Sequence, residues 1–533
     1  MPQPIQILFL ARISKVLAAA ACSMAFLLRS ARIPGFTGSR HTAHAGILRA
    51  PGRQGHLAAP RDAILRKCGL AILTVLQLTS AAWATDPKPT EKPKSFYRAP
   101  RSYSTTRDPD PPKYVKPAPL TSFDALQSAD WLDIGMDYRF RYEYREDDIR
   151  RPQAGLDDPL LHRTRIYLGV HDLLDPFRFA VEMQDSRRDD SKYPLDDRDV
   201  NEFAVTRLQG ELFFRDALGT DSLGNDRPIS LRYGIQNFEF LDRRLLANNQ
   251  WRNTANTFLG FRGTLGQEAN DWSTDLLAIQ PLQRDLFGWD EPVDDRWIYG
   301  LIGHWRGWSD LATIEPFYLA LDQNQNDVSQ DRMVHSPGLR TYGTIGDTGF
   351  DFDVSLIGQV GRNGTNDVRA WGGTGEIGYS LQHAWKPRVS AFYGYASGDR
   401  DPNDGEDNRF ERFYGFGRPW SANDTIVFEN IRTPKVRVEL TPAEKVRLDF
   451  GYSWYHLASA TDRFSGGGNV RDSTGRSGDG IGHEFDIRSR FQITKQLEMV
   501  LGYSYFRPGD FVRNAIRPGD TDFVYLEVNL SVF

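Results

Sequence analysis

Apolar and polar residues alternate along most of the chain after residue 130. Over the fourteen residues from Leu132 to Arg145, the even-numbered positions are apolar or aromatic and most odd-numbered positions are charged. A period of two is typical of a β-strand with one apolar and one polar face. The segment is longer than most strands of soluble proteins, and it is long enough to cross a membrane at a tilt.

The same alternation recurs up to the C-terminus, and about eighteen such segments lie between Leu132 and Phe533. Clear examples are 163–171, 177–184, 446–455, 484–491 and 497–505. Long acidic connections between the segments occur at 187–200, 323–333, 399–408 and 460–480. Short connections occur at 173–176, 441–444 and 494–496. Short turns combined with long polar loops are typical of an outer-membrane β-barrel.

We therefore predict an all-β protein, a single transmembrane antiparallel β-barrel of about 18 strands. The alternative is a stack of soluble β-sandwiches, in which the apolar faces meet in a core. The polar positions are crowded with Arg beside Asp and Glu, whereas the apolar positions are rich in Tyr, Trp and Phe. A water-filled lumen inside an aromatic girdle accounts for both features, and a closed barrel pairs every backbone group, as lipid demands.

Composition narrows the class of protein further. After the first 84 residues there is no run of 18 or more apolar residues, which argues against a helical membrane protein. The aromatic share of 12% excludes disorder throughout the chain. A low mean hydropathy of −0.50 and 47 Gly residues agree with a large β protein.

The first 84 residues are predicted to be a targeting region. Arg66 and Lys67 precede an apolar stretch, 69–78, which is followed by Ala82-Trp83-Ala84. A basic segment, a short apolar segment and a small-x-small site define a secretory signal peptide, here at about 61–84, so the mature chain should begin at Thr85. Residues 1–60 arise either because the translation start is placed too far upstream or because the signal sequence is extended.

Removal of the targeting region changes both the charge and the cysteine content. Residues 1–84 contain ten Lys or Arg and one acid, Asp62, so the formal net charge falls from −5 to −14. Both cysteines, Cys22 and Cys68, are removed, which excludes a disulfide scaffold. A strongly acidic exported chain is not expected to bind nucleic acid.

The mature chain is predicted to have two parts. Residues 85–129 are rich in proline, with nine prolines between Thr85 and Leu120, and should form an extended, semi-rigid linker. Residues 130–533 should form the barrel.

Motifs for catalysis are weak. The run 373–378 matches a dinucleotide-binding pattern but lies within the strand series, and there is no G-x-S-x-G sequence. Asp399, Asp401 and Asn403 resemble the start of a calcium loop, but Gly405 comes one position late. We expect no enzyme, no cofactor and no metal centre, although the sequence leaves loose binding of calcium by this loop open.

Four blocks resemble the alginate export family of outer-membrane β-barrels, and they are spread over 131–533. The first contains a Gly-x-Gln strand, Arg-Leu, Trp-x-Asn and Phe-x-Gly-x-Arg, here Gly234, Gln236, Arg244, Leu245, Trp251, Asn253, Phe258, Gly260 and Arg262. The others contribute Gln359 and Gly361; Ser397, Gly398 and Asp399; and Gly482, Glu484, Asp486, Pro508 and Gly509. The resemblance implies a channel in the outer membrane that exports alginate or a similar anionic polysaccharide.

Arginines on the inward parity are the candidate substrate-binding residues, because a planar guanidinium matches a carboxylate. They are Arg139, Arg141, Arg163, Arg165, Arg232, Arg262, Arg340, Arg437, Arg488 and Arg490. Asp and Glu share the same parity, so these arginines could instead form cross-strand ion pairs that stiffen the wall.

The expected partners are an anionic polysaccharide and the lipid bilayer, with periplasmic export machinery as a further candidate. A general porin for small solutes is the alternative function, and a barrel enzyme is a second rival for which no nucleophile–base pair is found.

Overall fold

A computed structural model describes residues 94–101, 108–151, 153–326, 330–415 and 421–532. All of them belong to the second of two compact units, residues 64–533. The predicted signal peptide, its cleavage site and the start of the linker lie outside the described residues. In the part of the chain described here, no helix is both long and apolar enough to cross a membrane.

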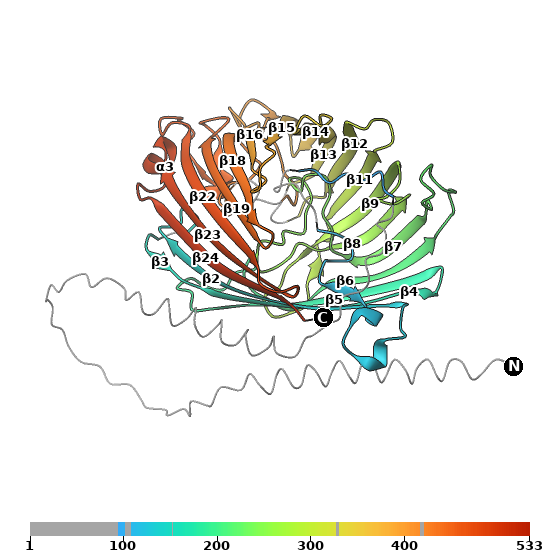
Figure 1. The fold of residues 1–533 in the computed structure, drawn as a ribbon. Helices are drawn as coiled ribbons and strands as arrows, with labels where there is room; N and C mark the ends of the chain where they lie inside the picture. Colours follow the sequence, from blue (N-terminus) through green and yellow to red (C-terminus); the bar gives the residue numbers. More distant parts are fainter. Residues whose placement is uncertain (1–93, 102–107, 152, 327–329, 416–420, 533) are drawn as a thin grey trace, which may run out of the picture. The chain divides into compact units, whose positions relative to one another are not determined.

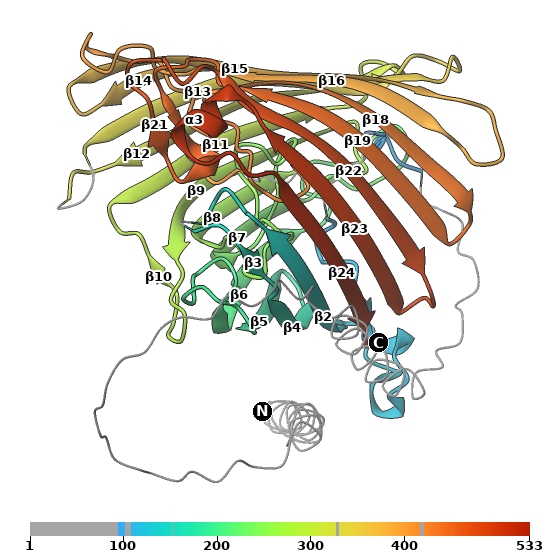
Figure 2. The same ribbon diagram turned by 90° about the vertical axis from the view of Figure 1, so that its left-hand side faces the viewer.

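Eighteen antiparallel strands form a closed barrel, which confirms the predicted fold class and strand number. Each strand pairs with its neighbours in sequence order, and β2 closes the ring because it pairs with both β4 and β24. Figures 1 and 2 show the strands side by side at a common tilt. They are β2 (Leu132–Glu146), β4 (Leu160–Leu174), β5 (Phe177–Asp189), β6 (Asn201–Phe214), β7 (Ile229–Gln236), β8 (Phe258–Leu265), β9 (Trp272–Gln283), β11 (Arg296–Trp305), β12 (Ala312–Gln323), β13 (Arg332–Thr344), β14 (Phe350–Asn363), β15 (Asn366–Ser380), β16 (Arg388–Ala396), β18 (Ile431–Ala443), β19 (Val446–His456), β22 (Gly480–Gln492), β23 (Leu497–Pro508) and β24 (Thr521–Ser531).

Short strands and helices lie in the connections and in the N-terminal segment. The short strands are β1 (Val115–Pro117), β3 (Leu156–Asp157), β10 (Glu291–Pro292), β17 (Glu406–Asp407), β20 (Arg463–Phe464) and β21 (Val470–Arg471). The short helices are η3 (Ala118–Leu120), η4 (Asp124–Leu126), η5 (Ser465–Gly467) and α3 (Asp510–Ala515).

The predicted alternation of faces is clear in β14. Leu356 and Val360 point outward and are 58% and 54% exposed, whereas Ser355 and Gln359 point inward and are 2% and 1% exposed. Alternation follows from the pleat of the strand, which places successive side chains on opposite faces. The outward parity is thus the surface that faces lipid.

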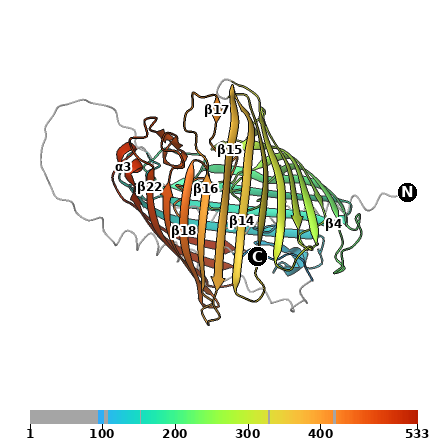
Figure 3. The same cartoon turned by 90° about the horizontal axis from the view of Figure 1, so that it is seen from above.

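The two ends of the barrel differ. At one end, here called the turn end, short connections such as 175–176, 444–445 and 493–496 join the strands. At the other end, the loop end, the connections are longer and include 190–200, 237–257, 397–430 and 457–479. Figure 3 shows β17 and α3 at the loop end. In outer-membrane barrels short turns face the periplasm, so the turn end is the periplasmic end.

Two of the long loops fold into the barrel at the loop end. Residues 237–257 and 397–415 meet at a bridge between Leu246 and Tyr414. The apolar side chains of the two loops, among them Phe240, Phe410 and Phe428, form a buried cluster with inward-facing residues of the wall. The lumen was predicted to be water-filled, but this part of it holds a hydrophobic core. The wall residues that complete the core include Leu277, Ile279, Ile298, Ile302, Leu319 and Leu321.

The chain contacts the barrel well before residue 130. β1 pairs with β2 through Val115 and Gly135, on the stretch of β2 that β24 leaves uncovered beyond its last pair, Asp137 with Ser531. Residues 108–126, assigned to a linker from the sequence, therefore pack against the barrel. Proline content indicated an extended conformation but could not indicate which polar partners the segment would meet.

Candidate functional site in the lumen

Ion pairs join neighbouring strands around much of the inner wall. Arg340 on β13 lies between two buried carboxylates, 3.0 Å from Glu315 on β12 and 2.8 Å from Asp353 on β14. His304 on β11 contacts Glu315 at 2.8 Å and Asp275 on β9 at 3.3 Å. These contacts form a continuous row of alternating charge, which we call the ion-pair belt.

The ion-pair belt continues on the next strands. Arg388 on β16 contacts Asp351, Glu376 and Glu439 at 2.6 to 2.8 Å. Arg437 and Arg488 both bind Asp449 on β19. Arg490 lies opposite Arg447 in the pairing of β19 with β22. Arg340, Arg437 and Arg488 thus take part in cross-strand ion pairs, the second of the two roles considered from the sequence.

Four other predicted arginines hold the inward-folded loop 237–257. Arg139 donates hydrogen bonds to the carbonyl oxygens of Gln250 and Arg252 at 2.9 and 2.7 Å. Arg141 donates to the carbonyl oxygen of Trp251 at 2.7 Å, and its guanidinium lies 4.0 Å from the centre of the Trp251 ring. Arg163 and Arg165 contact Gln250, and Arg165 also binds Asp137 at 2.8 Å.

The remaining two predicted arginines meet at a carboxylate that the N-terminal segment supplies. Asp110 lies 2.8 Å from Arg232 and 3.8 Å from Arg262, and it also lies 2.8 Å from Arg207. Arg232 also binds Glu211 at 3.0 Å, and Arg262 binds Asp275 at 2.9 Å. Three adjacent strands, β6, β7 and β8, therefore direct guanidinium groups at one carboxylate.

Residues of the family-like blocks act as anchors for the inward-folded loops. The Asn253 amide, which is fully buried, donates to the carbonyl oxygens of His162, Arg187 and Asp199 at 2.9 to 3.0 Å. Gln359 on β14 exchanges hydrogen bonds with the backbone of Glu411 at 2.7 and 2.8 Å. The first two blocks thus each tie a loop to the wall.

Backbone conformation explains why the paired positions of the first block are glycine. Gly234 and Gly260 lie opposite each other on β7 and β8, with φ of 131° and 148°. A Cβ on Gly234 would lie 2.1 Å from the carbonyl oxygen of Leu208, and one on Gly260 would lie 2.3 Å from that of Ala278. Side-chain-bearing residues rarely adopt this conformation, so glycine is required at both positions.

Asn253→Ala should lower the free energy of unfolding by about 1–3 kcal/mol, because buried carbonyl groups lose their donor. Asn514→Ala, which removes an exposed amide with one contact to Ser477, is the control and should change it by less than about 0.5 kcal/mol. Guanidinium-induced unfolding in lipid vesicles, followed by tryptophan fluorescence, measures both. Equal effects of the two variants would contradict the anchoring role.

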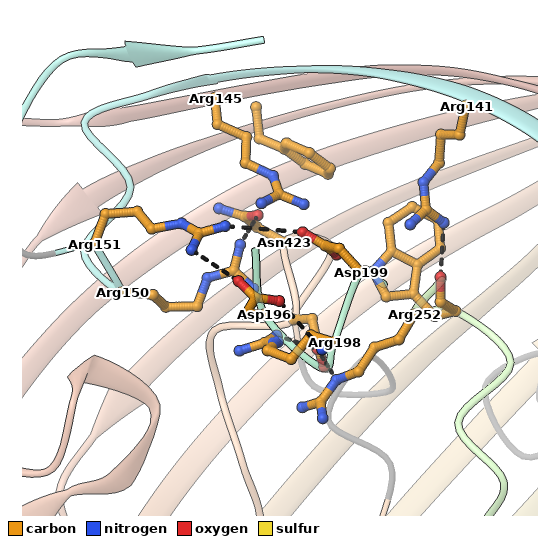
Figure 4. A pocket seen from close by; sticks show the side chains of 12 residues that line it. Arg141, Arg145, Arg150, Arg151, Asp196, Arg198, Asp199, Arg252 and Asn423 are labelled. Carbon is orange, nitrogen blue, oxygen red and sulfur yellow. Dashed lines mark hydrogen bonds and ion pairs between the residues drawn. The ribbon is translucent and has the colours of Figure 1, made fainter. Parts of the chain in front are cut away.

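A cavity of about 230 Å³ lies between the wall and the loops at the loop end. Six arginines line it together with three aspartates: Arg141, Arg145, Arg150, Arg151, Arg198, Arg252, Asp196, Asp199 and Asp424. In Figure 4, Arg141 and Arg145 descend from the strand at the top, and Arg150 and Arg151 enter from the left. We call this cavity the arginine pocket.

Arginines outnumber aspartates among the residues that line the arginine pocket, although Glu143 pairs with Arg141 and Arg145, and Asp148 pairs with Arg150. Burial and the guanidinium groups of Arg252 and Arg150 lower the pKa of Arg198 to about 9. Burial would raise the pKa of Asp424, but Arg252, Arg198 and Arg150 outweigh it and lower that pKa to about 2. The shift of Asp424 has the direction that neighbouring guanidinium groups produce, whereas burial would lower the pKa of Arg150 but Asp148 raises it.

Most arginines of the pocket were missed in the sequence. Arg150, Arg151, Arg198 and Arg252 lie in connections between strands, where no alternation assigns a direction to a side chain. Arg145 continues the inward parity of Arg139 and Arg141, so the pattern could have included it. Arg207 follows an irregularity in the register of β6, which hid its inward direction.

Comparison with known proteins agrees with this geometry. A sequence model described as alginate export matches residues 130–522. Three crystal structures cover 75% of this chain: Acinetobacter baumannii OccAB1 (11% identity, 97% of that chain, TM-score 0.51), Pseudomonas aeruginosa OccK8, also called OprE (13%, 98%, 0.50), and P. aeruginosa OpdQ (14%, 97%, 0.50). At these identities they show a shared fold. No curated protein sequence matches the chain.

The closed barrel, its outward apolar face and its charged inner wall define an outer-membrane channel protein. The chain belongs to the alginate export family.

Proposed function

We propose that this channel exports an anionic polysaccharide, alginate or a similar polyuronate, and that it acts as a conduit without catalysis. The observation that carries the proposal is the arginine pocket. Six guanidinium groups converge on a cavity of about 230 Å³, which is large enough for a sugar unit but lies within a longer lumen. Guanidinium groups bind carboxylates through paired, charge-assisted hydrogen bonds.

The acidic charge of the whole chain does not oppose this role. The field inside a narrow passage is set by nearby groups, because salt screens charges beyond about 8–10 Å. Asp190 and Asp404 are exposed and Glu406 is half-buried; they lie in connections or the short strand β17, away from the arginine pocket. Periplasmic machinery that delivers the polymer would approach the turn end.

Reversal potentials in a salt gradient test the proposal. The unmodified channel should prefer chloride over potassium, and a defined hexauronate should block the current. Arg151→Gln combined with Arg198→Gln should weaken the block about tenfold and move the reversal potential toward zero, because two of the six pocket cations are lost.

Arg369→Gln is the matched control for this experiment. Arg369 is 64% exposed and pairs with Glu406, outside the arginine pocket, so its loss should leave selectivity unchanged. Preference for cations in the unmodified channel would overturn polyanion export and favour a general porin for small solutes.

A further inference from the structure

The N-terminal segment 108–117 lies in the lumen and runs from the inward-folded loop 237–257 to the turn end of the barrel. Its backbone amide at Asp108 donates to Glu239 of loop 237–257 at 3.1 Å. The Tyr114 hydroxyl donates to the buried Glu182 carboxylate on β5 at 2.8 Å. The segment leaves at β1, which pairs with the turn-end part of β2.

Within this segment, Asp110 is the residue that three arginines contact. Its two carboxylate oxygens are bound separately, one by Arg207 and one by Arg232, each at 2.8 Å. Arg262 approaches the second oxygen at 3.8 Å. Burial would raise the pKa of Asp110, but Arg207, Arg232 and Arg262 hold it well below its ordinary value. The Asp110 side chain still keeps 35% of its exposure, so the site opens to the lumen.

We infer that Arg207, Arg232 and Arg262 form a carboxylate-binding site for the polymer, and that segment 108–117 is a displaceable internal plug whose Asp110 occupies it. This inference rests on the proposed function for the identity of its ligand. The Asp110 carboxylate has the same charge, planarity and size as the carboxylate of a uronate sugar. The three arginines therefore already hold a mimic of the ligand.

The contacts of the segment suit a plug that can leave. Its backbone forms just three residue pairs with the barrel, Val115, Lys116 and Pro117 with Gly135, Ile134 and Asp133. The remaining attachments of residues 108–113 are side-chain or single backbone contacts, whereas Tyr114 and Val115 pack in a small buried cluster with Tyr167 and Ala180. A tethered group competes at an effective concentration on the order of millimolar. A polymer that presents many carboxylates along the lumen can exceed that concentration locally.

Gly135 shapes the path of the segment. A Cβ at this position would lie 2.9 Å from both the Tyr114 ring and the Val115 backbone. Gly135 is on the inward parity of β2, where its neighbours are charged. The missing side chain leaves room for the segment to cross the wall at this point.

Asp110→Asn tests the plug with little change in shape. The variant should bind a defined hexauronate about tenfold more tightly, as measured by block of current in planar bilayers, because the competing charge is gone. The conductance in potassium chloride should also rise. Asp108→Asn is the matched control, since it removes an exposed carboxylate two residues away, and it should change neither quantity.

A disulfide supplies the opposite test. Lys116 and Ile134 are directly opposed in the register, so Lys116→Cys with Ile134→Cys should form a bond that retains the segment. Hexauronate block should be weaker in the oxidised form than in the reduced form of the same protein. Because one protein is compared with itself, a folding defect cannot imitate the result.

The outcomes separate the two proposals. If Asp110→Asn and the oxidised disulfide leave both block and conductance unchanged, the plug is overturned while export can stand. If conductance responds but hexauronate blocks none of the forms and chloride is not preferred, the segment is a plug and the carboxylate ligand is overturned together with the proposed function.

Discussion

Arg340→Met should lower the free energy of unfolding by about 3–5 kcal/mol, because buried Asp353 loses its ion-pair partner and buried Glu315 keeps only the contact with His304. Glu315 and Asp353 are 0% and 7% exposed, and Arg340 itself is 1% exposed. Neither carboxylate can reach water without movement of the wall. Guanidinium-induced unfolding of the barrel in lipid vesicles measures the effect.

Arg369→Met is the control for the buried pair. Arg369 on β15 also pairs with a carboxylate, Glu406, but both groups are exposed, at 64% and 36%. Exposed pairs contribute about 0–1 kcal/mol, so this variant should be nearly neutral. Addition of Glu315→Gln and Asp353→Asn to Arg340→Met should recover much of the loss. Equal costs at Arg340 and Arg369 would show that the ion-pair belt does not stabilise the wall.

Leu356→Arg should lower the free energy of unfolding by about 2–4 kcal/mol, because it places a charge in the middle of the lipid-facing surface. Leu356 is near the centre of β14 and is 58% exposed on the outward parity. Folding into vesicles, followed by the shift in gel mobility between folded and heated protein, reports the loss together with equilibrium unfolding.

Two variants bracket this effect. Leu356→Met keeps an apolar side chain and should be close to neutral. Ile345→Arg changes a residue that is 44% exposed in the short connection after β13, near the edge of the membrane, where the cost falls to about 0–1 kcal/mol. A cost at Ile345 as large as that at Leu356 would mean that depth in the bilayer does not govern the response.

Alternation of apolar and polar residues was enough to predict the strands in which every second side chain faces lipid. β2, β4 and β14 show the rule, because a pleated strand exposes opposite faces to opposite surroundings. The alternation is broken at 203–215 for a local reason. The register of β6 against β5 shifts between Glu182 and Met183, and Phe203 has a φ of 56°. The irregularity turns both Thr206 and Arg207 into the buried side of the strand, so the period of two is broken there.

At 426–440 the apolar residues do not all belong to one strand. Ile426 and Phe428 are apolar because they pack in the core of the inward-folded loops, not because they lie in a strand. The strand β18 begins at Ile431. A run of apolar residues looks the same in both settings, and what surrounds it decides which one applies.

By itself, the sequence determined the fold class, the number of strands and, outside irregular strands such as β6, the face that strand residues present, because these depend on local alternation along the chain. The partner of each inward arginine was decided by the tertiary structure. Arg340 lies between two carboxylates, Arg139 holds a loop more than one hundred positions away, and Arg232 meets Asp110 of the N-terminal segment. These contacts join residues that are remote in sequence. Which charges balance, and which remain for a ligand, is therefore set by the register of the strands and the inward path of the loops.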